Sequence, residues 1–165
     1  MHIQKEDLKE LEFPELLAEI SPFAFSAKTA ERISALRPFG IDEAEVSLKK
    51  VAEYVASFES DNAIPFNEYD DIDEELNLML IENFRLDNAA FLKIKSLTEQ
   101  IARLQKFYPV YEDLFLHLNS DVKDLEYRKE IVDKIDKVFN RFGEVKSDSS
   151  PILKTLRADI SHAKK

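Results

Sequence analysis

The sequence contains no cysteine and only two glycines among its 165 residues, and each shortage limits what the chain can be. Without cysteine it forms no disulfide, thiol nucleophile or zinc–thiolate site, which favours the cytoplasm as its compartment. A glycine-poor chain has few places at which a helix breaks. Gly40 and Gly143 also stand alone, so the sequence lacks the G-x-x-x-x-G-K-[ST] loop that cradles phosphates. We therefore expect no nucleotide hydrolysis and no other catalysis by this chain.

Long apolar runs are missing as well. No segment approaches the roughly 18 apolar residues of a membrane helix, and Met1–Asp7 lacks the apolar core of a signal peptide. The residues that are present, 44% hydrophobic and 34% charged, are typical of a folded globular protein. We predict one helical domain over residues 1–165, without a membrane partner.

Basic residues are scarce in the first half of the chain. The net charge is −10, and residues 1–85 hold 20 acidic and 8 basic residues, whereas residues 86–165 hold 13 acidic and 15 basic residues. Affinity for nucleic acid comes largely from neutralising phosphates, so the acidic half should repel DNA. Any phosphate contact would belong to the second half, although a solvated acidic surface alone also explains the asymmetry.

Apolar residues recur at helical spacing almost everywhere, which predicts an all-α bundle of six or seven helices. Pro38 and Pro109 each favour the end of a helix before them. Asp42 and Glu45 have the spacing of a capping box at a helix start. The segments with helical spacing are residues 13–20, 27–37, a segment after Asp42, a segment after the acids at 70–75, a long segment after Asp87, 112–118, 124–137 and 151–165.

Two apolar stripes are the longest in the chain, and we predict that both lie in the core. Each repeats at alternating three- and four-residue steps, the spacing of a helix-packing seam. The residues are Leu48, Val51, Val55 and Phe58 in the first stripe, and Ile94, Leu97, Ile101 and Leu104 in the second.

The segment 138–153 combines a tight reversal with a helix start. Gly143 supplies a backbone conformation with positive φ, and the flanking apolar pairs could form a small β-hairpin over residues 138–146. Ser150 can cap the helix that follows, and Pro151 suits its first position. This pattern predicts a structural hinge whose key residues are Gly143, Glu144, Val145, Asp148, Ser150 and Pro151.

This segment, preceded by Ile135 and Asp136, resembles the "I-D…G-E-V-x-D-x-x-S-P-x-L" signature near the amino terminus of the second bacterial subgroup of MutS proteins, although Asp148 lies one position after the aspartate of the signature. Residues 11–20 resemble the opening helix of that subgroup, and residues 34–38 resemble its "L-K-P" helix stop. The resemblance covers the chain from about Leu11 to its end and rests on short helical motifs.

The resemblance implies that this chain is an amino-terminal core region, lacking the mismatch-reading domain, that connects a DNA-embracing clamp to an ATPase. It implies that residues 151–165 begin a truncated lever helix. The parent protein would then be a DNA-binding homodimer that uses ATP and Mg²⁺, and many members also carry a nuclease-like domain. DNA, the clamp and the ATPase would be the partners of this region.

Other candidate sites have simpler explanations. The acids at 70–75 could bind a hard cation but lack an EF-hand layout, and they suit a helix start. The three histidines, His2, His117 and His162, have no metal-binding spacing, and His117 is expected to be a partly buried structural residue. Basic residues between 128 and 146 alternate with acids, which favours ion pairs on a helix surface over a DNA groove.

Two alternatives stay open beside the mechanical region of a MutS-like protein. The first is a stand-alone acidic helical module that binds a basic protein partner. The second is a small metal-dependent hydrolase, which would need Asp70, Asp73 or Glu74 to converge with His117 in space.

Overall fold

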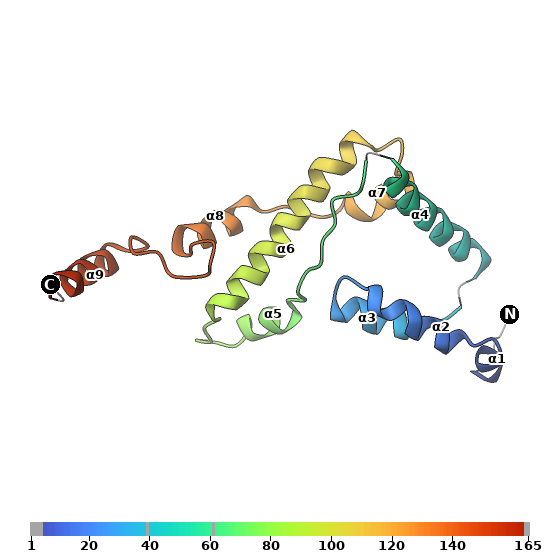
Figure 1. The fold of residues 1–165 in the computed structure, drawn as a ribbon, viewed down its shortest axis with the longest axis horizontal. Coiled ribbons are helices and arrows are strands. Elements are labelled where there is room, and N and C mark those ends of the chain that lie inside the picture. Colours follow the sequence, from blue (N-terminus) through green and yellow to red (C-terminus); the bar gives the residue numbers. More distant parts are fainter. Residues whose placement is uncertain (1–4, 39, 61, 164–165) are drawn as a thin grey trace. The chain divides into compact units, whose positions relative to one another are not determined.

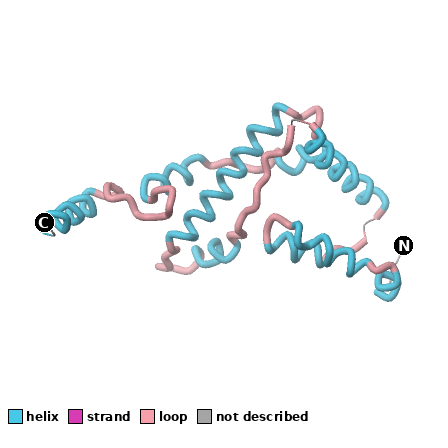
Figure 2. Tube along the Cα trace, viewed as in Figure 1, coloured by secondary structure: helices cyan, strands magenta, loops and turns pink. Residues whose placement is uncertain are grey.

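The structure, a computed structural model, describes residues 5–38, 40–60 and 62–163, and consists of helices joined by loops (Figures 1 and 2). Within these residues there are α-helices and 3₁₀ turns but no strand, so the all-α prediction is confirmed. The α-helices are α1 (Lys5–Glu10), α2 (Phe13–Ile20), α3 (Ala27–Ser34), α4 (Ile41–Glu59), α5 (Asp73–Met79), α6 (Asn88–Phe107), α7 (Leu116–Val122), α8 (Lys129–Val138) and α9 (Pro151–Ala163), and the 3₁₀ turns are η1 (Ser21–Phe23) and η2 (Tyr108–Val110).

Several helix starts follow from their capping residues, as predicted. Ser26 is extended, with its Oγ accepting a hydrogen bond from the Thr29 amide at 3.2 Å, and α3 begins directly after it. The Asp87 carboxylate accepts a hydrogen bond from the Ala90 amide at 2.8 Å at the start of α6. Side chains that satisfy free amide groups therefore mark these helix starts in the sequence.

Other boundaries differ from the prediction. The extended residue before α4 is Gly40, so Asp42 lies inside the first turn and is not the cap. The helices expected at 112–118 and 124–137 are instead α7 and α8, which begin four and five residues later. Tyr108 and Phe115 are buried, and their packing holds the chain between them in turns. Tertiary packing thus overrides the local propensity there.

The chain divides into two compact units, residues 1–71 with 100–126 and residues 72–99 with 127–165. Helix α6 contributes its first part to the second unit and its last turns to the first. The prediction of a single domain stays a prediction. No helix in the described ranges is long and apolar enough to cross a membrane.

The core of the first unit is aromatic. Leu104, Tyr108 and Phe115 are buried at its centre. Burial raises the pKa of Tyr108 to about 12, with a smaller contribution from the nearby Glu53 carboxylate. Partly buried side chains surround this centre: Ile64, Phe66, Phe107, Tyr111, Leu118, Val122 and Leu125.

The second unit has a smaller apolar core. Ala90 of α6 and Val132, Ile135 and Phe139 of the α8 region are buried. The rings of Phe91 and Phe139 stack with their centroids 5.5 Å apart. Helix α8 therefore packs through a narrow apolar face, and the residue that follows the helix completes that face.

The prediction that both long stripes are buried is wrong for α4. Leu48, Val51, Val55 and Phe58 are between 51% and 68% exposed. In the α6 stripe, Leu104 is buried and Ile94, Leu97 and Ile101 are half-buried. Helix α4 packs against α7 through a different side, which carries polar residues, and this explains why its apolar stripe faces away.

Candidate functional site

The predicted hinge at 138–153 is a tight reversal between α8 and α9. Phe139 and Val145 form an isolated antiparallel bridge, with the Lys146 amide donating to the Val138 carbonyl at 2.8 Å. The Gly143 amide donates to the Asn140 carbonyl at 3.0 Å and closes the turn. The expected β-hairpin is therefore present only as a single bridge.

Asn140 organises this turn with its side chain, a role that the sequence prediction does not include. Its Oδ1 accepts hydrogen bonds from the amides of Phe142, at 2.9 Å, and Glu144, at 3.1 Å. Its Nδ2 donates to the Glu144 carboxylate at 2.9 Å. Asparagine that bonds to the backbone two residues on is a known turn signal, so Asn140, three residues before Gly143, could have been recognised.

Gly143 has a φ of 78°, as the sequence predicts. A Cβ atom at this position would lie 2.7 Å from the Leu92 Cδ1 atom of α6. The position therefore requires glycine for two reasons, the left-handed backbone and the space that Leu92 occupies. The contact with Leu92 could not be read from local sequence.

Two lysines attach this region to its own unit through Asp136. The Lys95 amine lies 2.5 Å from the Asp136 carboxylate, and this hydrogen bond raises the pKa of Lys95. The Lys146 amine donates to the Asp136 backbone carbonyl at 2.5 Å. The end of α8 is thereby tied both to α6 and to the strand-like segment after Gly143.

The start of α9 is capped as predicted. The Ser150 hydroxyl accepts a hydrogen bond from the Leu153 amide at 3.2 Å, and Pro151 occupies the first helical position. Arg157 of α9 donates to the Ser147 hydroxyl at 2.9 Å. A polar cavity of about 460 Å³ lies beside the turn, and its lining residues are Asn140, Glu144, Val145, Lys146, Ser147, Asp148 and Arg157.

All six predicted hinge residues thus lie in one continuous structural element. Gly143, Ser150 and Pro151 have the conformational roles that the sequence assigns to them. Glu144 holds Asn140, whereas Val145 pairs with Phe139. Asp148 is exposed at the cavity wall. Hydrogen bonds from Asn140, the positive φ of Gly143 and the Ser150 cap hold the turn and the start of α9.

A second organised polar cluster lies in the first unit, where Glu53 of α4 caps α7. Its carboxylate accepts hydrogen bonds from the amides of His117 and Leu118, both at 2.9 Å, and lies 2.7 Å from the His117 Nδ1 atom. Burial raises the pKa of Glu53, but these hydrogen bonds outweigh burial and leave the pKa below its usual value. Nearby, the Lys50 amine lies 2.7 Å from the Asp121 carboxylate.

Two of the acids at 70–75 have structural partners. Asp71 accepts a hydrogen bond from the Lys28 amide at 2.8 Å, and Glu75 pairs with the Lys93 amine at 2.8 Å. His117 is partly buried against Glu53, as expected, and His2 lies outside the described residues. Within the residues that the structure places, no group of three His, Cys, Asp or Glu side chains could hold a metal ion.

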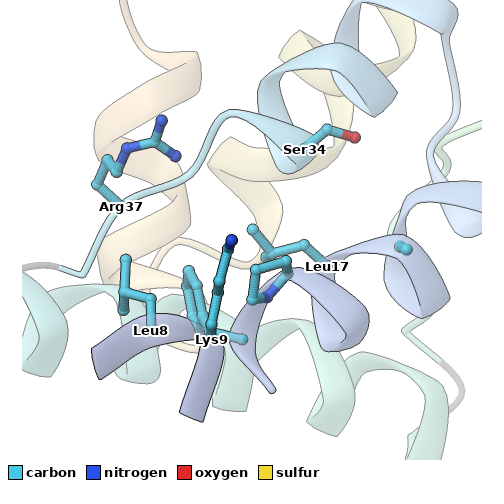
Figure 3. Close-up of a pocket in the computed structure, with 8 residues that line it drawn as sticks. Leu8, Lys9, Leu17, Ser34 and Arg37 are labelled. Carbon is cyan, nitrogen blue, oxygen red and sulfur yellow. The ribbon is translucent and has the colours of Figure 1, made fainter. Parts of the chain in front are cut away.

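The first unit also contains a cavity of about 320 Å³ formed by α1, α2 and the α3 region (Figure 3). Figure 3 shows Lys9 between Leu8 and Leu17, with Arg37 approaching from another part of the chain. The cavity could take an apolar molecule with an anionic group, because its two charged lining residues are both basic. Its lining residues are Leu8, Lys9, Phe13, Pro14, Leu17, Ala18, Ser34 and Arg37.

Comparisons with protein-family models, with curated protein sequences and with solved structures gave no match to this chain.

Proposed function

We propose that this chain is a mechanical, non-catalytic core region of a MutS-like DNA-binding ATPase of the second bacterial subgroup. In this role it connects the clamp to the ATPase and takes part in the control of DNA repair or recombination. The observation that carries the proposal is the segment 138–153, because the residues that resemble the subgroup signature also have specific structural roles. Gly143 has positive φ, Ser150 caps α9 and Pro151 begins it.

The apolar side of α9 supports a connecting role. Ile152, Leu156 and Ile160 lie at four-residue steps and are between 53% and 74% exposed. A helix with such a stripe is stabilised when another element covers it. In the proposed parent this cover is the remainder of the core and lever.

The proposed parent is a cytoplasmic homodimer that binds DNA and uses ATP with Mg²⁺. We expect the region described here to contribute no residue to the binding of ATP or Mg²⁺. Its net charge of −10 opposes the approach of phosphates, so we expect no submicromolar binding of duplex or branched DNA at about 150 mM salt. Fluorescence anisotropy with labelled duplex and branched DNA tests this expectation.

The decisive observation is the gene beyond codon 165. The proposal predicts a continuing helix and, further on, a G-x-x-x-x-G-K-[ST] loop. In the full-length protein, Gly143→Val should reduce the stimulation of ATP hydrolysis by DNA, because α9 then leaves the turn in another direction. Gly40→Ala is the matched control, since a Cβ atom there meets nothing within 4 Å. Unchanged stimulation in a folded Gly143→Val protein would contradict the mechanical role of this turn.

The second candidate is a stand-alone acidic module that binds a basic protein. The exposed apolar stripe of α4 favours it, since large apolar surfaces on a folded chain commonly mark interaction sites. A stop codon directly after Lys165 would favour this function over the MutS-like one.

A further inference from the structure

An ordinary surface helix packs against the protein through its apolar side, whereas α4 packs through its polar side and exposes its apolar side. Its contacts with α7 come from polar residues: Lys50 pairs with Asp121, and Glu53 accepts hydrogen bonds from the α7 amides. Ser57 on the same side is fully buried, and its hydroxyl donates to the Tyr54 carbonyl at 2.7 Å. Figure 1 shows α4 beside α7. The hydrogen-bonded side of the helix is therefore the anchored side.

The opposite side carries the α4 seam, defined as Leu48, Val51, Val55 and Phe58. These residues recur at steps of three, four and three, and Ile41 and Ala44 extend the pattern toward the helix start. The seam residues are between 51% and 68% exposed, and Ile41 is 80% exposed. Such spacing over five turns is the pattern of a helix that packs lengthwise against another helix.

The charges beside the α4 seam limit what can cover it. The exposed charged residues of α4 outside the α7 contact are Asp42, Glu43, Glu45 and Glu59, with Lys49 as the single base. An amphipathic helix that binds an anionic membrane carries an excess of Lys and Arg on its polar side, whereas in α4 the acidic residues outnumber the two lysines. A second copy of the same acidic helix would add negative charge to a chain of net charge −10.

We propose that the α4 seam docks a partner helix that has apolar residues at heptad spacing and Lys or Arg residues beside them. Apolar contact along the seam supplies the affinity, and the partner's bases meet Glu45 and Glu59 at its two ends. The proposal does not rest on the MutS-like function. It assigns to this chain a protein-binding surface of defined residues, length and charge.

The test uses the whole 165-residue chain and two labelled synthetic helices of about three heptads. Both have Leu at the a and d positions, and they differ only in carrying Lys or Glu at the flanking positions. Fluorescence anisotropy should show that the Lys helix binds at least about tenfold more tightly than the Glu helix, with a preference that weakens as salt rises. Equal binding of the two helices would overturn the proposal.

Variants then locate the binding surface. Val51→Glu should weaken binding of the Lys helix by about tenfold or more, whereas Ile160→Glu, the same kind of change on exposed α9, should not. Both side chains are exposed, so both variants should keep the wild-type unfolding temperature. If Ile160→Glu weakens binding as much as Val51→Glu does, the helix binds apolar surface without selecting α4, and the proposal fails.

Charge reversal gives a second, independent variant. The double change Glu45→Lys and Glu59→Lys should reverse the preference, so that the Glu helix binds more tightly. Sedimentation of the chain alone should show a monomer. Self-association that Val51→Glu abolishes would mean that a second copy covers the seam, which contradicts a basic partner helix.

Discussion

Helices α4 and α6 carry nearly the same sequence pattern but have opposite surroundings. Each has four apolar residues at alternating three- and four-residue steps. In α6, Leu104 lies in the aromatic core of the first unit, whereas in α4 every seam residue is exposed. The difference lies in the polar residues: those of α4 contact α7, and Glu53 among them accepts amide hydrogen bonds that a buried helix end needs.

The comparison shows what apolar spacing establishes. It identifies a helix and the side that will be covered, but the element that covers this side can belong to another molecule or segment. In α6 the residues that cover the apolar side at Leu104 belong to the same chain. In α4 the hydrogen bonds to α7 determine which side packs within the first unit, and the apolar side stays exposed.

The largest effect is expected when the same substitution is made in both helices. Leu104→Asp places an unpaired charge in a core and should cost several kcal/mol of a typical stability of about 5–15 kcal/mol. Leu48→Asp should cost less than about 1 kcal/mol, because Leu48 is 68% exposed and only the helix propensity changes. Chemical denaturation followed by circular dichroism measures both. Equal losses would show that the α4 seam is buried.

Gly143→Val should have the next largest effect. The variant must hold a β-branched residue at a φ of 78° and displace Leu92, and we expect a loss of about 2–4 kcal/mol. The loss should concern the second unit, which contains both residues. Hydrogen exchange should therefore increase around α8 while the amides of α7 keep their protection. Faster exchange throughout the chain would contradict this separation.

Glu53→Ala should have a smaller effect, centred on the α4–α7 contact. It leaves the His117 and Leu118 amides without an acceptor, which we expect to cost about 1–3 kcal/mol. Glu45→Ala on the exposed side of α4 is the matched control and should change stability by less than about 0.5 kcal/mol. If both variants lose the same stability, the polar side does not anchor α4.

The pH dependence of this contact follows from the direction of the shift. The pKa of Glu53 is lower in the folded chain than its ordinary value of 4.5. The stability that the Glu53 carboxylate contributes should therefore be fully present at a pH above that ordinary pKa. It should be lost as the pH falls through the pKa of Glu53 in the folded chain. The stability difference between wild type and Glu53→Ala should shrink in acid, as measured by urea unfolding across pH 3 to 7. A constant difference would contradict the role of the ionised carboxylate.

Much of the local structure could be predicted from capping residues and special backbone positions. Ser150 correctly marks the start of α9, and Gly143 has the expected positive φ. Contacts between residues far apart in sequence could not be predicted. The Leu92 contact that requires glycine at 143 joins α6 to the turn after α8, and the Glu53 cap joins α4 to α7. Local sequence patterns carry no information about such pairs.

The most direct test of the account compares the accessibility of the two stripes. Because the chain has no cysteine, a single one introduced by Val51→Cys or Leu104→Cys is a unique probe. The account predicts that a maleimide labels position 51 at least about a hundredfold faster than position 104 in the native chain, since a buried thiol reacts only after local opening. It also predicts that a saturating concentration of the synthetic Lys helix slows labelling at position 51 and leaves labelling at position 104 unchanged. Equal labelling rates at the two positions in the native chain would contradict the account.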